Sequence, residues 1–248
     1  MTVLSSLRSA SNVAVIGASG GIGRAFAELL ATDAGIGEVH AFSRAPDEWP
    51  GHKVRSHRLD LTDESSIEAA AAAATAAAPL DLVIVASGIL HRGDRIRPEK
   101  TMRELDPESL TEVLAVNLVG PALLAKHFLP VLRRDHKAVF AALSARVGSI
   151  SDNRLGGWAA YRTSKAALNM LVRTVAIEQT RNAPESVVVA LHPGTVDTAL
   201  SQPFTRRTPR AKLFTPAMSA TKMLGVIDAL SPEQTGGFFA YDGSPIEY

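Results

Sequence analysis

A cluster of glycines between an apolar segment and an amphipathic segment constrains the fold more than any other feature. Residues 12–16 are short, apolar and largely β-branched, and Gly17-Ala18-Ser19-Gly20-Gly21-Ile22-Gly23 follows them directly. One apolar stripe at helical spacing then comes from Ile22, Phe26, Leu29 and Leu30. A strand, a glycine turn and a helix in this order predict a βα unit whose helix N-terminus can face a pyrophosphate.

The same alternation continues along the chain. The expected strands are 12–16, 38–42, 54–59, 81–86, 138–143, 187–191 and 237–241, and the helical patterns lie near 22–33, 63–78, 108–134, 158–182 and 215–230. Strands that alternate with helices pair in parallel through right-handed crossovers. We therefore expect an α/β fold, with a single doubly wound (Rossmann-type) parallel sheet of about seven strands and helices on both faces. No linker divides the chain, so one domain is expected over residues 1–248.

Composition excludes several classes of function. The absence of cysteine rules out disulfides, thiolate catalysis and thiolate metal sites, and the histidines show no metal-ligand spacing. A net charge of +1 gives no field that would attract nucleic acid or an anionic membrane. No apolar run reaches the ~18 residues that span a bilayer. We expect a cytoplasmic protein that acts on a small molecule, with no nucleic acid, membrane or metal as partner.

The end of the second expected strand indicates which dinucleotide binds. An NAD site usually carries a carboxylate there for the ribose 2′-hydroxyl, whereas NADP needs a cation for the 2′-phosphate. The chain has Ser43-Arg44 at this place, and the first carboxylate is Asp47, beyond Pro46. NADP(H) is therefore expected in preference to NAD(H). The alternative is that Arg44 is only a solvated loop residue.

A tyrosine and a lysine offer acid–base chemistry. Tyr161 and Lys165 are four residues apart in a helical pattern, so they share one helix face. A phenol has an ordinary pKa of about 10. A nearby ammonium, together with the positive nicotinamide ring of an oxidised cofactor, favours the phenolate and lowers that pKa.

Together these features resemble the short-chain dehydrogenase/reductase family over essentially the whole chain. Gly17, Gly21 and Gly23 are similar to its Gly-x-x-x-Gly-x-Gly motif, and Tyr161 with Lys165 to its Tyr-x-x-x-Lys motif. Further matches, in chain order, are Asp60, Ala86-Ser87-Gly88, Asn117, Ser144 and Pro193-Gly194-Thr195-Val196-Asp197-Thr198.

The resemblance implies how a carbonyl and an alcohol would be interconverted. Tyr161 exchanges a proton with the substrate oxygen, and Lys165 holds the nicotinamide ribose and lowers the Tyr161 pKa. Ser144 polarises the carbonyl, and Asn117 holds a water that connects Lys165 to solvent. Hydride transfer belongs to the cofactor. The expected cofactor-binding residues are Gly17, Ser19, Gly21, Ile22, Gly23, Ser43, Arg44, Asp60, Leu61, Ser87, Gly88, Tyr161, Lys165, Pro193, Gly194, Val196 and Thr198.

Three segments, residues 143–150, 161–165 and 238–243, more narrowly resemble the C-factor-like carbonyl reductase branch. The chain also departs from the family pattern. Gly20 stands where many NADP enzymes have a basic residue, which leaves the cofactor preference to Arg44. Ser144 precedes Tyr161 by 17 residues, more than the family's usual dozen or so, and Ser149 is the competing candidate for the catalytic serine.

Two functions remain in competition. The first is an NADP(H)-dependent carbonyl reductase or alcohol dehydrogenase. The alternative is a dinucleotide-binding regulatory or signalling protein of the same fold with little turnover, against which the complete set of four catalytic matches argues. A methyltransferase is disfavoured because it needs no Tyr161/Lys165 pair. The resemblance leaves a homodimer, a homotetramer and a monomer open.

The substrate depends on loops 89–108, 145–160 and 199–214, which the sequence does not shape. Trp158 either lines the substrate pocket or packs in the core, and both readings stay open. The basic residues Arg206, Arg207, Arg210 and Lys212 are read as a solvated loop, with recognition of an anionic substrate as the alternative.

Overall fold

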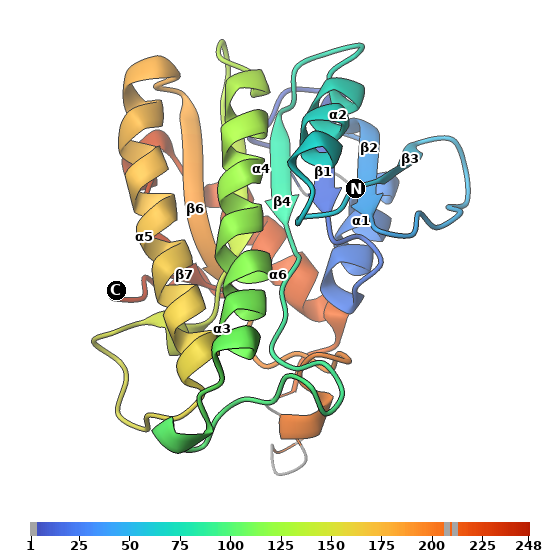
Figure 1. Ribbon diagram of the computed structural model, residues 1–248. Coiled ribbons are helices and arrows are strands. Elements are labelled where there is room, and N and C mark those ends of the chain that lie inside the picture. Colours follow the sequence, from blue (N-terminus) through green and yellow to red (C-terminus); the bar gives the residue numbers. More distant parts are fainter. Residues whose placement is uncertain (1–3, 206–208, 210–212) are drawn as a thin grey trace.

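The computed structural model describes residues 4–205, 209 and 213–248 and is built on a seven-stranded sheet (Figure 1). All neighbouring strands pair in parallel, in the order β3-β2-β1-β4-β5-β6-β7. The strands are β1 (Ser11–Ile16), β2 (Ile36–Ser43), β3 (Val54–Arg58), β4 (Leu82–Val85), β5 (Ala138–Leu143), β6 (Ser186–His192) and β7 (Phe238–Ala240). The predicted Rossmann-type α/β fold is confirmed, and each predicted strand is found within two residues of its expected bounds.

Helices cover both faces of the sheet (Figure 1). α1 (Gly21–Thr32) and α6 (Pro216–Ala229) pack together on one face, and α2 (Glu64–Ala74), α4 (Gly120–Phe128) and α5 (Ala159–Asn182) cover the other. Side chains alternate between the faces along each strand. Val13 and Val15 lie in the core under α1 and α6, whereas Ala14 and Ile16 lie in the core under α2, α4 and α5.

The segment predicted as one helix over 108–134 is interrupted. α3 (Pro107–Leu114) passes into a π-helical turn (Ala115–Val119), then into α4 and a 3₁₀ turn (Leu129–Val131). By length and composition alone, the 25-residue segment Pro107–Val131, which contains an 18-residue window with a mean hydropathy of 1.4, could cross a membrane. Val113, Leu124 and Phe128 are instead buried within the molecule, which explains the apolar composition as that of a covering helix.

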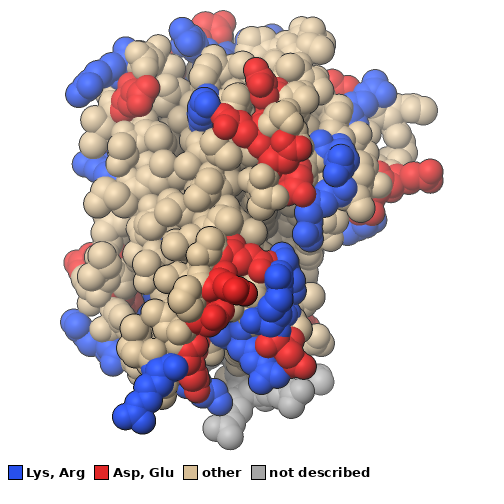
Figure 2. All heavy atoms as spheres, viewed as in Figure 1, with Lys and Arg blue, Asp and Glu red and all other residues tan. Residues whose placement is uncertain are grey.

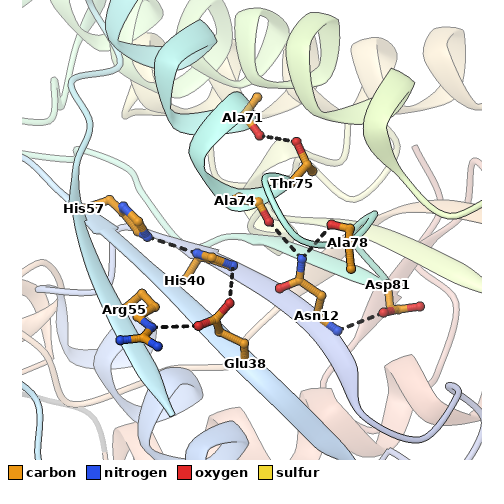
Figure 3. A network of polar contacts seen from close by, with 10 residues as sticks. All are labelled: Asn12, Glu38, His40, Arg55, His57, Ala71, Ala74, Thr75, Ala78 and Asp81. Atoms are coloured by element: carbon orange, nitrogen blue, oxygen red, sulfur yellow. Dashed lines mark hydrogen bonds and ion pairs between the residues drawn. The ribbon is translucent and has the colours of Figure 1, made fainter. Parts of the chain in front are cut away.

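A polar network ties the start of β1 to its surroundings (Figure 3). The Asn12 amide donates hydrogen bonds to the carbonyl oxygens of Ala74 (2.8 Å) and Ala78 (3.0 Å), at the end of α2. The Asn12 N–H donates to the carboxylate of Asp81 at 2.8 Å, and the buried guanidinium of Arg133 forms an ion pair with the same carboxylate. These contacts fix the beginnings of β1 and β4 relative to α2 and to the chain after α4.

A second network lies on β2 and the edge strand β3 (Figure 3). His40 Nδ1 is 3.0 Å from His57 Nε2, while Glu38 lies 3.4 Å from His40 Nε2 and 2.7 Å from Arg55 Nε. Burial is the main cause that lowers the pKa of His40 to about 4, and it also lowers the pKa of His57. Both rings are therefore neutral at pH 7.

Candidate active site

The glycine turn after β1 is packed too tightly for larger residues at two positions. Gly17 has a positive φ of 87°, and a Cβ on it would lie 2.9 Å from the Ser87 main-chain nitrogen. A Cβ on Gly23 would lie 2.1 Å from the Gly17 carbonyl oxygen. Gly20 precedes α1 without a side-chain cap, and the first turn of α1 contains no acidic residue. The N–H groups at this helix start are therefore available to an anion.

A cavity of about 600 Å³ opens beside this turn, at the carboxyl ends of β1, β2 and β4. Its lining includes eight of the predicted cofactor-binding residues: Gly17, Ser19, Ser43, Arg44, Asp60, Leu61, Ser87 and Gly88. The hydroxyl of Ser87 is buried there without a hydrogen-bond partner among the described residues. An unpartnered hydroxyl, a glycine cradle and an uncapped helix start fit the phosphates and ribose of a nicotinamide dinucleotide.

Charged groups of both signs gather on the loop after β4, in the lower part of the face that Figure 2 shows. Arg92 and Arg95 both form ion pairs with Glu112 of α3. Arg92 and Glu112 also line the cavity, so an ion pair forms part of its wall.

Arg44 is an exposed lining residue of the cavity and makes no hydrogen bond or salt bridge with any residue that the structure describes. Nearby, the carboxylate of Asp60 accepts hydrogen bonds from the Thr62 N–H (3.0 Å) and hydroxyl (2.8 Å). These bonds are the main cause that lowers the Asp60 pKa, and the positive charge of Arg44 adds to it. The Ser43 hydroxyl donates to the Ala45 carbonyl oxygen at 2.6 Å. Arg44 thus offers a free guanidinium, whereas Ser43 is engaged locally.

Tyr161 and Lys165 lie one turn apart on α5 and are 9% and 3% exposed. The Lys165 ammonium is 5.8 Å from the centre of the Tyr161 ring and donates to the Leu143 carbonyl oxygen at 2.9 Å. Burial lowers the pKa of Lys165 to about 8 and raises the pKa of Tyr161 to about 12. Burial is the cause that raises the Tyr161 pKa in this pair, and the lowering expected from Lys165 together with an oxidised nicotinamide ring stays a prediction for the cofactor complex.

Asn117 is fully buried in the π-helical turn. Its side chain accepts from the Ile89 N–H at 2.8 Å and donates to the Ile89 carbonyl oxygen (2.8 Å) and the Ser164 hydroxyl (3.0 Å). A Cβ on Gly88 would lie 3.4 Å from Asn117 Oδ1 and 3.6 Å from Lys165 Nζ, so these three residues converge. Single π turns often mark functional sites. Here the turn holds the loop after β4 against α5.

Ser144 directly follows β5 and is 3% exposed. Its hydroxyl donates to Asn169 Oδ1 at 2.7 Å, and the Asn169 amide donates to the Gly148 carbonyl oxygen at 3.3 Å. The competing Ser149 accepts from the Asp152 N–H at 3.1 Å within a turn. Both hydroxyls therefore have local partners, and a carbonyl substrate would have to compete with Asn169 for the Ser144 proton.

The Pro-Gly segment after β6 reaches back to the glycine turn. The Pro193 carbonyl oxygen accepts from the Ser219 hydroxyl at 2.7 Å, and Val196 is buried. Gly194 has φ 79°, and a Cβ on Gly21 would lie 3.0 Å from the methyl carbon of Thr198. Gly21, Ile22 and Gly23 themselves form the first turn of α1 beside the cavity. The basic positions 206, 207, 210 and 212 lie outside the described residues.

Two residues of the site were not found from the sequence. Glu99 is 5% exposed, and its carboxylate accepts from the Ala160 N–H at the start of α5. Nothing distinguishes it from the other charges of its loop. Asn169 has a usable signal, because it follows Lys165 by four residues and therefore shares its helix face. The described part of the chain holds no group of three or more His, Asp or Glu side chains that could bind a metal.

Comparison with known proteins agrees with this geometry. The family described as short chain dehydrogenase matches residues 11–209. The C-signal of Myxococcus xanthus is 38% identical over 146 residues, which is 58% of this chain and 82% of the relative. The 1-hydroxy-2-glutathionyl-2-methyl-3-butene dehydrogenase of Rhodococcus sp. is 30% identical, over 96% of this chain and all of the relative.

Among solved structures, the NADPH-bound carbonyl reductase from chicken fatty liver superimposes with a TM-score of 0.85 at 29% identity. The match covers 99% of this chain and 96% of that chain. The resemblance to the dehydrogenase/reductase family, with C-factor and carbonyl reductase relatives, is confirmed.

Proposed function

Because the chain belongs to the short-chain dehydrogenase family, we propose that it is an NADP(H)-dependent carbonyl reductase that acts as one domain over residues 1–248. The observation that carries the proposal is the buried Tyr161/Lys165 pair, placed near a cavity that fits a dinucleotide. The likeness to a carbonyl reductase with bound NADPH supports it. The predicted cytoplasmic location is kept as part of the proposal.

The bound nicotinamide supplies the hydride. The Tyr161 hydroxyl gives its proton to the carbonyl oxygen, and the Lys165 ammonium, fixed by the Leu143 carbonyl, stabilises the phenolate that remains. Burial raises the pKa of the Tyr161 phenol to about 12, which makes it a weak acid. The phenolate would therefore be stabilised by the Lys165 ammonium together with the positive charge of the bound oxidised nicotinamide ring. We assign carbonyl orientation to Ser144 and support of the Lys165 environment to Asn117.

We assign the cofactor to the cavity and the adjoining turns. Its pyrophosphate would lie on the start of α1, its adenine side near Asp60 and Leu61, and its nicotinamide side near Ser87, Gly88 and the segment from Pro193 to Thr198. Arg44 is the residue we assign to the 2′-phosphate, since it is an exposed lining residue of the cavity and its guanidinium is unpaired among the described residues.

The test of cofactor preference is a fluorescence titration of NADPH and NADH with the wild type, Arg44→Ala and Arg181→Ala. A lost charge-assisted contact should raise the NADPH dissociation constant of Arg44→Ala about 10- to 100-fold and leave that of NADH unchanged. Arg181→Ala likewise removes an exposed charge, at the far end of α5, and should change neither constant. Equal losses for both cofactors in Arg44→Ala would overturn the preference.

The test of catalysis is NADPH oxidation with a panel of ketones and aldehydes. Tyr161→Phe should keep NADPH binding and lose about 10²- to 10⁴-fold in turnover, because it removes only the proton donor. Binding of NADPH without turnover of any carbonyl by the wild type would favour the alternative, a dinucleotide-binding regulatory protein. The similarity to the C-signal is the observation that supports this alternative.

A homodimer or homotetramer is also proposed. The face over α4 and α5 carries few charged side chains (Figure 2). Val119, at the end of the π-helical turn, and Met170 and Ile177, on α5, are each about half or more exposed. Light scattering gives the mass in solution. A monomeric mass at micromolar concentration would contradict this part of the proposal.

A further inference from the structure

Three aromatic side chains from three separate loops meet beside Tyr161. Trp158 directly precedes α5, His91 lies in the loop after β4, and Phe204 ends a 3₁₀ turn (Gln202–Phe204) after β6. The Phe204 ring centre is 5.1 Å from that of Trp158 and 5.6 Å from that of His91. The Trp158 ring centre is 6.4 Å from that of Tyr161, at an interplanar angle of 72°. The rings form one edge-to-face wall that ends at the proposed proton donor.

This wall is not part of the hydrophobic core. Among the described residues, the buried core clusters include neither Trp158 nor Phe204, and Phe204 is 37% exposed. The core beside the start of α5 is completed by smaller side chains, among them Ile96, Val113 and Ala160. Large rings that remain partly exposed beside a reacting group are available to a ligand.

The backbone of Trp158 is held in an unfavourable conformation. Its φ and ψ are 53° and 42°, in the left-handed region that bulky residues rarely adopt, and Gly156 and Gly157 before it also have positive φ. The Glu99 carbonyl oxygen accepts from the Trp158 N–H at 2.5 Å, and the buried Glu99 carboxylate accepts from the Ala160 N–H at 3.3 Å. Glu99 therefore holds the turn that places the indole beside Tyr161, and such strain persists where the surroundings enforce it.

We propose that Trp158 and Phe204 determine substrate specificity, and that they select carbonyl compounds whose carbonyl is attached to a flat aromatic ring; this inference rests on the proposed function. An aryl group can take the place of Phe204 in its edge-to-face contact with Trp158 while its carbonyl reaches Tyr161. A puckered aliphatic ring of the same size has no π-face and a less polarised edge, so its contact with Trp158 is weaker. Glu99 is a positioning residue, because it acts through Trp158.

The test uses two ketones of the same connectivity, acetophenone and cyclohexyl methyl ketone, reduced with NADPH. The measured quantity is the ratio of their kcat/KM values, which is compared between proteins so that the intrinsic reactivities cancel. Trp158→Leu should lower this ratio about 3- to 10-fold, and Trp158→Phe should keep it within about 2-fold. Both variants place a side chain on the same left-handed backbone, so the strain is matched.

Glu99 is tested in the same assay. Glu99→Ala should lower the ratio as Trp158→Leu does, with an unchanged NADPH dissociation constant. Glu99→Gln keeps an oxygen acceptor for the Ala160 N–H and should restore the ratio. A purely structural role for Glu99 would lower kcat/KM for both ketones equally and leave the ratio unchanged, which would overturn the positioning role.

A second readout does not need turnover. The chain has two tryptophans, so Trp49→Phe leaves Trp158 as the single tryptophan, which is excited selectively at a wavelength that tyrosine does not absorb. With NADP⁺ present, acetophenone should quench its fluorescence saturably, and cyclohexyl methyl ketone should do so much more weakly. Absence of saturable quenching, or an equal ratio of the two kcat/KM values in all variants, would overturn the proposal that the aromatic wall selects the substrate, even if carbonyls are reduced. Quenching without reduction of any carbonyl leaves the wall standing and overturns the proposed function.

Discussion

The Lys165 ammonium donates a 2.9 Å hydrogen bond to the main-chain carbonyl of Leu143, the last residue of β5. The bond joins α5 to the carboxyl end of β5, an inner strand, and the cavity also lies at the carboxyl ends of the strands. It fixes a positive charge 5.8 Å from the centre of the Tyr161 ring. The Leu143 carbonyl thus fixes where the Lys165 amine lies, whereas the pH determines whether that amine is protonated.

The first prediction concerns the pH dependence of turnover. Burial lowers the pKa of Lys165 to about 8, so the ammonium is present below that pH and is lost as the pH rises through it. NADPH oxidation by the wild type should therefore fall above about pH 8. Lys165→Met should be about 10²-fold or more slower at pH 7 and should not show this fall. Stopped-flow rates from pH 6 to 10 measure both, and an unchanged profile in Lys165→Met would contradict the assignment.

The second prediction compares two glycines. Gly23→Ala should strongly weaken NADPH binding and lower the melting temperature, because its Cβ would lie 2.1 Å from the Gly17 carbonyl oxygen. Gly225 lies exposed in α6, and no atom beyond its chain neighbours and the adjacent helix backbone lies within 4 Å of its Cβ position. Gly225→Ala should therefore stabilise the protein by about 0.5–1 kcal/mol, through helix propensity alone. Calorimetry and NADPH titration check both, and retained binding in Gly23→Ala would contradict the packing argument.

Most of the sheet could be predicted because its inner strands are short, apolar and buried on both faces, whereas the edge strand β3 is polar and largely exposed. Residues 138–143 were predicted with the bounds that β5 has, and each of the six residues is buried. The π-helical turn at Ala115–Val119 could not be predicted, since the apolar pattern continues through it and one extra residue per turn leaves no mark in the sequence.

The site was predictable where function depends on spacing along one element. Tyr161 and Lys165 share a helix face by their separation alone, and the glycine turn is contiguous. Contacts between loops were not predictable: the link from Glu99 to Trp158 joins segments 59 residues apart, and neither residue signals it. The burial that raises the pKa of Tyr161 could not be predicted, because burial of a side chain depends on the whole fold.

The third prediction concerns the buried ion pair of Asp81 and Arg133. Asp81 is fully buried, and besides the guanidinium its carboxylate accepts from the Asn12 N–H. Arg133→Met leaves that charge unpaired and should lower the free energy of unfolding by about 3–5 kcal/mol in urea titrations. Arg134→Met, at the exposed neighbouring position, should change it by less than about 0.5 kcal/mol. Adding Asp81→Asn to Arg133→Met should recover part of the loss, and equal effects of the two arginine variants would contradict the prediction.

The last prediction concerns the loss of stability at acidic pH that buried His40, on β2 beside the edge strand β3, causes. Burial, opposed in part by Glu38 and assisted by His57 and Arg55, lowers the pKa of His40 from 6.5 to about 4. Above pH 6.5 the ring is neutral in both the folded and the unfolded chain, so it makes no difference to stability. Between 6.5 and about 4 the unfolded chain binds a proton that the folded chain does not, and stability falls as the pH falls.

The pKa of His57 is lowered in the same direction, and burial lowers that of His192 to about 4, so the wild type should lose melting temperature over this window. His40→Gln removes one titrating ring, and its side chain can still contact His57. The stability of this variant should therefore fall less steeply with falling pH than that of the wild type. The difference in slope should be less than the ~1.4 kcal/mol per pH unit that one fully linked proton contributes. His52→Gln, in an exposed loop, is the matched control. Parallel melting curves for His40→Gln and the wild type from pH 7 to 4 would show that the buried histidine pair does not set this sensitivity.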